Sequence, residues 1–213
     1  SRADVSDTAA VTRNVKKATR FFGADLVGVC RLDRRWVYSH SYERETFDDT
    51  SVSGEGNGAS RPQEIPNEYQ YAVVMGFDMD YEMMKHYPSY IADSVVGMGY
   101  SRMAIANAHL AAFIRGLGFK TIDCSQNNVA LSVPLAMLAG IGDIGRNGLL
   151  VTPELGPRLR LSKVLTDLPL APDAPVDFGV TEFCEACEKC ADLCPSQAIS
   201  RGERTAEPQS ASN

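Results

Sequence analysis

Four cysteines near the C-terminal end of the sequence follow the pattern C-x2-C-x2-C-x3-C-P: Cys184, Cys187, Cys190 and Cys194. In ferredoxins this spacing places three thiolates on the corners of one iron–sulfur cluster and turns the fourth toward another cluster. Zinc sites usually have two cysteine pairs separated by a longer loop, and disulfides between such close neighbours would be strained. The motif therefore predicts one cluster on the first three cysteines and a second cluster that Cys194 helps to hold.

The chain's other two cysteines are not expected to complete these clusters. Cys30 and Cys124 fall in segments that read as buried strands, where cysteine behaves as a small apolar residue. We therefore expect the remaining ligands in a second motif beyond Asn213, which would make this sequence a C-terminally truncated fragment. The polar segment 203–213 fits a surface connection that leads onward.

Helical and strand patterns alternate through the rest of the chain and predict an α/β (α+β) fold. Helices are expected at residues 8–22 and 101–117, and strands at 26–30, 71–77, 119–124 and 158–166. The second helix has an apolar stripe in which residues recur every three or four positions. Counting back three residues from Met103 puts Tyr100 on the buried face at the helix start, just after the flexible segment 97–99. The buried stripe consists of Met103, Ala106, Leu110, Phe113, Ile114 and Leu117.

The strand at 158–166 alternates, with Leu159 and Leu161 on one face and Arg160 and Ser162 on the other. Before it, residues 130–148 read as a helix that breaks into a glycine-rich turn. Its G-x-G-x-x-G order follows a helix rather than a strand, which argues against dinucleotide binding. Its glycines either let the backbone approach a flat, bulky group or only make a turn.

Two irregular segments suggest the organisation of the chain. Residues 46–61 are rich in Gly, Ser, Asn and Asp and are expected to form a long loop that helps to shape a binding pocket. Residues 169–175 are proline-rich and mark a boundary. We expect a core over 1–168, a linker over 169–180 and the first half of an iron–sulfur module over 181–213.

Charge and hydropathy exclude two classes of partner and structure. The net charge of −6 and pI of about 5.1 argue against nucleic-acid binding, which needs clustered basic residues. The longest apolar runs are far shorter than the roughly 20 residues of a membrane span. The N-terminus has no apolar signal-peptide region.

Several motifs together resemble the corrinoid-dependent reductive dehalogenases: "FFGADLVGVCRLDRRW", "GMGYSRMA", and the run from "NNVALSVPLAMLAGIGDIGRNG" through "GPRLRLSKVLTDL" to the cysteines. The resemblance covers about residues 12–200. It implies the catalytic subunit of an enzyme that replaces a carbon–halogen bond with carbon–hydrogen, with a nitroreductase-like cobalamin-binding core and a partial ferredoxin-like module for two 4Fe-4S clusters.

The resemblance also implies roles for particular residues. Tyr100 would donate the proton, assisted by Asn127 and Arg160, because a guanidinium beside a phenol stabilises the phenolate left behind. The sequence lacks a D-x-H-x-x-G motif, which fits cobalamin bound base-off without a histidine ligand. The corrin contacts implied by the resemblance are Gly140, Gly142, Asn128 and Ser132.

The resemblance also implies partners and a location. The partners are a small organohalide, an electron donor protein or quinol-linked reductant, and a membrane-anchor subunit. The expected location is the outer face of the cytoplasmic membrane after export, with the cytoplasm as the alternative. Acidic residues around the cysteines would lower the cluster potential, unless they form only a solvated face; they are Glu182, Glu185, Glu188 and Asp192.

Two other functions are considered. Epoxyqueuosine reductase uses similar cofactors on a tRNA base, but it has an acidic residue, tyrosine and histidine near the position where this chain has Gly99, Tyr100 and Ser101. The acidic pI also argues against it. A plain iron–sulfur electron carrier would not need about 180 residues of folded chain ahead of the cysteines.

Overall fold

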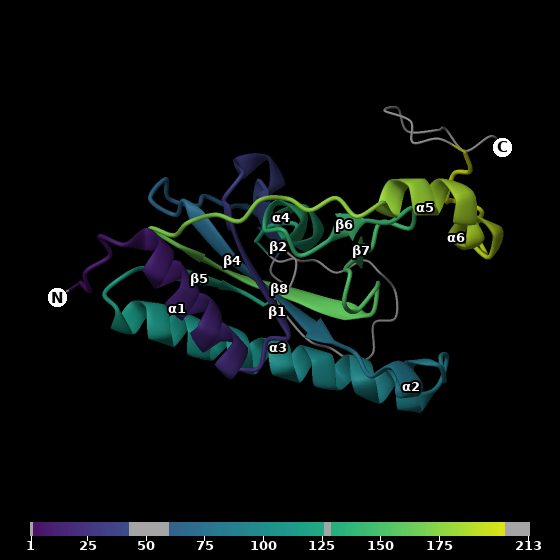
Figure 1. The fold of residues 1–213 in the computed structure, drawn as a ribbon, viewed down its shortest axis with the longest axis horizontal. Helices are drawn as coiled ribbons and strands as arrows, with labels where there is room; N and C mark the ends of the chain where they lie inside the picture. Colours follow the sequence, from purple (N-terminus) through teal and green to yellow (C-terminus); the bar gives the residue numbers. More distant parts are fainter. Residues whose placement is uncertain (1, 43–59, 126–128, 203–213) are drawn as a thin grey trace.

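A four-stranded antiparallel sheet forms the centre of the computed structural model, which describes residues 2–42, 60–125 and 129–202 (Figure 1). The strand order is β1 (Leu26–Arg31), β4 (Tyr71–Asp78), β8 (Leu159–Thr166) and β5 (Thr121–Cys124). Every neighbouring pair is antiparallel. The mixed α/β class is confirmed, and the predicted strands at these four positions are present.

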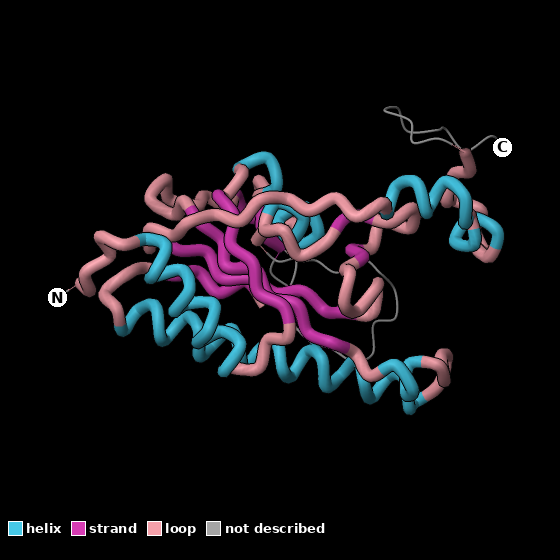
Figure 2. The backbone as a smooth tube through the Cα atoms, viewed as in Figure 1, coloured by secondary structure: helices cyan, strands magenta, loops and turns pink. Residues whose placement is uncertain are grey.

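Helices cover both faces of this sheet, as Figure 2 shows in cyan. Two of them, α1 (Thr8–Phe21) and α3 (Tyr90–Gly116), pack on the face that carries Val73, Met75 and Phe77 of β4. The short α4 (Ser132–Leu138) packs on the opposite face, against residues such as Val74. Because β4 is buried on both faces, its sequence is an unbroken apolar run rather than an alternating one.

The helix α3 differs from the prediction at its N-terminal end. It starts at Tyr90 and runs 27 residues, so the segment 97–99 is helical and Tyr100 lies inside the helix. The Tyr100 side chain is 40% exposed, and the prediction that it lies at a helix start on the buried stripe is wrong. Gly99 has a packing reason, since a Cβ there would lie 3.1 Å from Cγ of Arg160.

The predicted apolar stripe of α3 is otherwise confirmed. Met103, Ala106, Leu110 and Ile114 are buried, and two further members, Phe113 and Leu117, are partly buried against the same core. The predicted alternation of β8 is also confirmed. Leu159 and Leu161 pack on the α4 side, whereas Ser162 donates a hydrogen bond to Asn107 Oδ1 of α3 at 2.6 Å.

The proline-rich segment after β8 runs back past the α4 side of the sheet toward the cysteine helices (Figure 1). Asp173 fixes it to the edge strand β1: its N–H donates to Val29 O at 2.8 Å, and its carboxylate accepts from Val29 N at 2.7 Å. Lys16 of α1 forms an ion pair with the same carboxylate. The segment is therefore packed on the core, while the predicted domain bounds stay a prediction.

The glycine-rich turn after α4 forms a small hairpin of β6 (Asp143–Ile144) and β7 (Leu150–Val151). The cysteines lie on α5 (Val180–Cys187), on α6 (Lys189–Asp192) and just after α6. Glu188 separates these helices with a left-handed φ of 48°. The other elements are η1 (Arg34–Trp36), the pair β2 (His40–Tyr42) and β3 (Ser60–Pro62), and α2 (Tyr81–Met84).

The predicted long loop at 46–61 is described only at its end. That end lies in β3, and the rest of the loop falls outside the described residues. Within the ranges that the structure describes, no helix is long and apolar enough to cross a bilayer.

Candidate functional site

Tyr100 of α3 and Arg160 of β8 form a close pair. Arg160 Nη1 donates to the Tyr100 hydroxyl at 3.2 Å, and the guanidinium carbon lies 4.7 Å from the phenol ring centroid. The strand alternation turns Arg160 toward α3, and the absence of a side chain at Gly99 makes room for its stem. Both contacts place positive charge where a phenolate would form, so the pair is suited to proton donation.

This pair opens into a cleft of about 230 Å³ at one edge of the sheet. β5 ends opposite Lys163, so among the described strands residues 159–162 of β8 have no partner on that side. Ser132, a predicted corrin contact, also lines the cleft, together with apolar residues that include Leu149 and Leu161. Three of the predicted site residues therefore share one cavity: Tyr100, Ser132 and Arg160.

Arg160 also carries an unsatisfied donor. Its Nε is buried and has no hydrogen-bond partner within the described part of the chain. Leaving a buried N–H unpaired costs free energy, more so for a charged group. Because this atom is buried, a bound molecule could pair with it only after neighbouring side chains moved.

The other predicted contacts lie elsewhere. Asn127 and Asn128 fall outside the described residues. Gly140 and Gly142 pack against backbone: an added Cβ would lie 2.4 Å from Ala174 O and 2.1 Å from Val151 O, respectively. These close approaches explain both glycines as turn and packing residues, and their contact with a corrin stays a prediction.

A buried lysine behind the cleft was missed in the sequence. Lys163 is fully buried, and its Nζ donates to Ser132 Oγ at 3.0 Å. Burial lowers the pKa of Lys163 to about 8, against the opposing effect of the nearby Cys124. The alternation of β8 was the available signal, because Lys163 shares a face with Leu159 and Leu161.

We expect Lys163 to make stability rise with pH between about 8 and 9. Below pH 8 both folded and unfolded chains carry the proton, and the cost of the buried cation is fully present. Above it the folded state releases the proton first, so the unfolding free energy rises by up to about 1.4 kcal/mol per pH unit. Above pH 9 the raised pKa values of Cys30 and Cys124 oppose this rise.

The measurement is urea unfolding at pH 7.5, 8, 8.5 and 9. Lys163→Met should reduce the rise, because no ionisable group remains at that position. The pKa of the exposed Cys194 thiol, lowered to about 7, adds a smaller rise to both proteins. The control is Lys17→Met at an exposed position of α1, which should keep the wild-type slope. An unchanged slope in Lys163→Met would assign the pH dependence to other groups.

The cysteines divide into two kinds by their surroundings. Cys184, Cys187 and Cys190 line one cavity of about 390 Å³, and Cys194 does not. Its sulfur contacts Ser196 Oγ at 3.4 Å, and this hydrogen bond, with backbone donors such as Ala198, lowers the pKa of the Cys194 thiol to about 7. This arrangement supports the predicted division of three cysteines and one.

The two remaining cysteines are buried core thiols, as predicted. Cys30 is 2% exposed and Cys124 is fully buried. Desolvation raises the pKa of each to about 12, which favours the protonated thiol over the thiolate that binds metal.

The lining of the cysteine cavity is compatible with an iron–sulfur cluster. Such a cluster binds each thiolate at a different iron, so its ligands surround a volume. Three thiols around an apolar cavity match that requirement, and all four cysteines of the motif are free.

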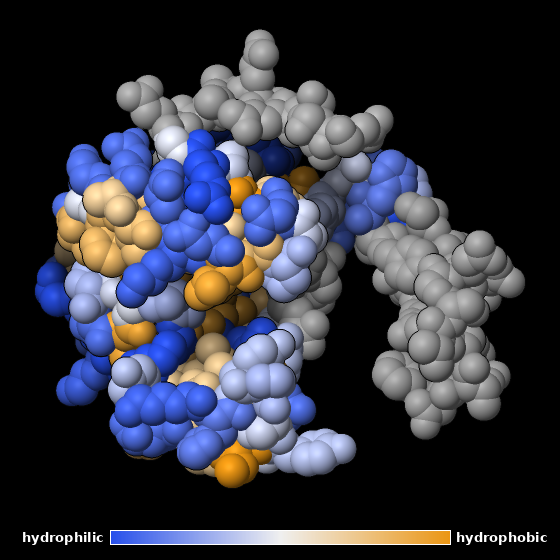
Figure 3. Space-filling view, turned by 90° about the vertical axis from the view of Figure 1, so that its right-hand side faces the viewer, coloured by the Kyte–Doolittle hydropathy of each residue, from blue (hydrophilic) through white to orange (hydrophobic). Residues whose placement is uncertain are grey.

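The end of the molecule that carries these cysteines is hollowed. Figure 3 shows a recess between its upper and lower parts, with hydrophobic groups gathered beside hydrophilic ones. Phe183 and Leu193 are 67% and 79% exposed in the cysteine segment, and Phe178 contributes to the cavity wall.

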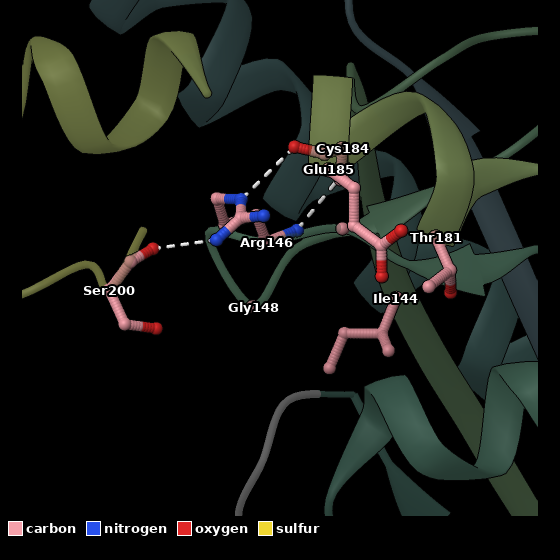
Figure 4. Close-up of a pocket in the computed structure, with 8 residues that line it drawn as sticks. Ile144, Arg146, Gly148, Thr181, Cys184, Glu185 and Ser200 are labelled. Carbon is pink, nitrogen blue, oxygen red and sulfur yellow. Dashed lines mark hydrogen bonds between the residues drawn. The ribbon is translucent and has the colours of Figure 1, made fainter. Parts of the chain in front are cut away.

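Arg146 of the β6–β7 turn holds the cysteine segment, and nothing in the sequence pattern singled it out (Figure 4). Its Nε donates to Cys184 O at 3.1 Å, and its Nη1 and Nη2 donate to Ser200 O and Gly202 O, each at 2.7 Å. Its backbone N–H also donates to Cys184 Sγ at 3.5 Å. A cavity of about 240 Å³ lies beside these contacts.

Comparison with known proteins was made at the level of sequence and of structure. No family model matches the chain. The tetrachloroethene reductive dehalogenase of Sulfurospirillum multivorans is 43% identical over 99% of this chain, and that of Dehalobacter restrictus is 42% identical over 89%. The chain spans 44% and 38% of the lengths of these two relatives.

Among solved structures, a catabolic reductive dehalogenase in complex with 3-bromo-4-hydroxybenzoic acid matches 93% of the chain, with a TM-score of 0.78 and 32% identity. The chain covers 27% of that protein. A second reductive dehalogenase structure is described as suggesting a mechanism for B12-dependent dehalogenation. It matches 92% of this chain and 27% of its own length, with a TM-score of 0.78 and 31% identity.

An epoxyqueuosine reductase solved with a modified tRNA stem loop is more distant. It matches 89% of the chain and 53% of its own length, with a TM-score of 0.56 and 18% identity, which indicates a shared fold alone. In sequence, the epoxyqueuosine reductase of Lactococcus garvieae is 41% identical over 32% of this chain and 18% of its own length.

Proposed function

We propose that this chain, which is homologous to the reductive dehalogenases over 99% of its length, carries the proton donor and part of the electron inlet of a cobalamin-dependent reductive dehalogenase. The reaction would be R–X + 2 e⁻ + H⁺ → R–H + X⁻. The observation that carries the proposal is the Tyr100–Arg160 pair, which faces a cleft that shares the β6–β7 hairpin with the cysteine cavity.

Tyr100 would supply the proton of this reaction. Its hydroxyl lies in the cleft and accepts a hydrogen bond from Arg160 Nη1, so the guanidinium would stabilise the phenolate as the proton moves to carbon. The predicted role of Asn127 is to assist at the same place.

The cleft residues would also contact the cofactor. Cobalamin, when bound, supplies the reduced cobalt that cleaves the carbon–halogen bond. Ser132 would meet it from α4, held from behind by Lys163. The proposed contacts at Gly140, Gly142 and Asn128 and the base-off state belong to the same proposal.

The cysteines would deliver the electrons. Cys184, Cys187 and Cys190 would hold one 4Fe-4S cluster, and Cys194 would contribute to a second. We also propose that residues 1–168 form a nitroreductase-like core, followed by a linker over 169–180 and a ferredoxin-like module that begins at 181. We further propose an external electron donor, a membrane-anchor subunit and a location at the outer face of the cytoplasmic membrane.

Epoxyqueuosine reduction is the second candidate, and the shared fold supports it. The surroundings of Tyr100 favour dehalogenation. Gly99 and Ser101 flank it in this chain, whereas epoxyqueuosine reductases have an acidic residue and a histidine at these places. The broader sequence identity to the dehalogenases also favours the first candidate.

The test uses the protein expressed from its complete coding sequence and reconstituted with iron, sulfide and cobalamin. With a low-potential reductant, we expect one halide ion released for each two electrons consumed, from a chlorinated ethene or a brominated hydroxybenzoate. Omitting cobalamin should abolish release. A protein that takes up iron but no cobalamin would instead be an electron carrier, and turnover of an epoxyqueuosine stem loop alone would favour the second candidate.

A further inference from the structure

The β6–β7 hairpin forms a wall between the Tyr100 cleft and the cysteine cavity. Leu149 and Leu150 line the cleft, whereas Gly145, Arg146 and Val151 line the cavity. A change in how the cysteine segment sits on this hairpin would therefore change both cavities together.

Arg146 makes the connection between hairpin and cysteine segment. Its guanidinium donates to Cys184 O and to Ser200 O, beyond the last cysteine (Figure 4). It also donates to Gly202 O. Glu188 also binds this region, by accepting from Gly202 N at 2.7 Å. One side chain thus ties together the start and the end of the segment that carries all four cysteines.

The local sequence explains why Arg146 reaches this position. The turn closes with Gly145 N donating to Leu149 O at 2.8 Å and Gly148 N donating to Gly145 O at 2.9 Å. Gly148 has a φ of +78°, which glycine adopts without strain. The tight turn directs the Arg146 N–H toward the Cys184 sulfur, at 3.5 Å.

Arg146 also changes the charge balance around the cysteines. Between Cys184 and Gly202 the segment carries three acidic residues, Glu185, Glu188 and Asp192. Its own basic residues are Lys189 and Arg201, the latter paired with Asp192 at 2.9 Å. Arg146 adds a cation beside Cys184 from outside the segment. Positive charge and N–H donors near a cluster sulfur stabilise the more negative, reduced cluster and so raise its reduction potential.

We propose that Arg146 is a positioning residue for electron delivery. It fixes the cysteine segment on the hairpin and raises the reduction potential of the cluster that Cys184 helps to hold. This inference rests on the cluster assignment within the proposed function, and it does not depend on the identity of the organohalide.

The test compares Arg146→Gln with Arg201→Gln, which removes the same charge from a residue that pairs with Asp192. Both variants are made in the reconstituted full-length protein, and each cluster is titrated against potential by electron paramagnetic resonance. For Arg146→Gln we expect the ratio of reduced to oxidised cluster at fixed potential to fall about tenfold, or about 59 mV for one electron. Arg201→Gln should stay within about twofold of wild type.

A second variant and a second measurement keep the test decisive if Arg146→Gln fails to bind its cluster. Arg146→Lys keeps the charge without the fork of donors, so its potential should lie between those of Gln and wild type. Amide hydrogen exchange over residues 184–202 should be faster in cluster-free Arg146→Gln than in cluster-free Arg201→Gln. Equal potentials or an equal fall in both Gln variants, together with equal exchange, would overturn the inference.

The outcomes separate this inference from the proposed function. Wild-type protein with clusters but no cobalamin would refute the dehalogenase, while the titration would still decide the role of Arg146. Wild-type protein without any cluster would refute both.

Discussion

Replacing Tyr100 with phenylalanine is expected to lower the dehalogenation rate by about 10² to 10⁴ fold, the usual contribution of a positioned acid. The change removes one hydroxyl, the acceptor of the 3.2 Å hydrogen bond from Arg160, and keeps the ring that stacks under the guanidinium. Cobalamin and iron contents should equal those of wild type. The measurement is halide release by the reconstituted protein with excess reductant.

The matched control is Tyr90→Phe, which makes the same chemical change on the same helix at a side chain that is 91% exposed. It should leave the rate unchanged. Unimpaired turnover in Tyr100→Phe with both cofactors bound would remove Tyr100 from the acid role.

Replacing Cys187 with alanine is expected to remove one cluster and, with it, turnover. Cys187 lines the shared cavity, so its loss should lower the iron content by about half and leave the signal of the second cluster. Cys194→Ala should give the opposite pattern, because Cys194 does not line that cavity. Iron analysis and electron paramagnetic resonance distinguish the two.

Cys30→Ala serves as the control, since this buried thiol has its pKa raised to about 12 and lies in β1. It should retain full iron. If Cys187→Ala and Cys194→Ala both kept all iron, or both lost the same cluster, the division into three ligands and one would be wrong.

The sequence predicted those parts of the fold that periodicity controls. The β8 alternation and the α3 stripe are local patterns, and both were correct: α3 buries one face, and the two faces of β8 pack against different helices. The predicted start of α3 was wrong because Gly97 and Gly99 look like a helix break in the sequence. The structure explains Gly99 instead by its close contact with Arg160, 61 residues later. Local propensity is a weak signal when tertiary packing decides.

The candidate site divides in the same way. Residue spacing identified the cysteines, and the family resemblance identified Tyr100 and Arg160, whose pairing the structure adds. Arg146 could not be found from spacing, because its partners lie 38 to 56 residues away. Lys163 could have been found, since its place in the alternating strand put a charge on the apolar face that carries Leu159 and Leu161.

The attachment of Asp173 to Val29 has a consequence for self-association. An uncovered edge strand is a template to which another molecule can add a strand, and such addition leads to aggregation. The segment that leads to the cysteines occupies part of the β1 edge with a reciprocal pair of hydrogen bonds. The middle of one margin of the sheet is thereby withheld from intermolecular pairing, and on the opposite side residues 159–162 are left for the cleft.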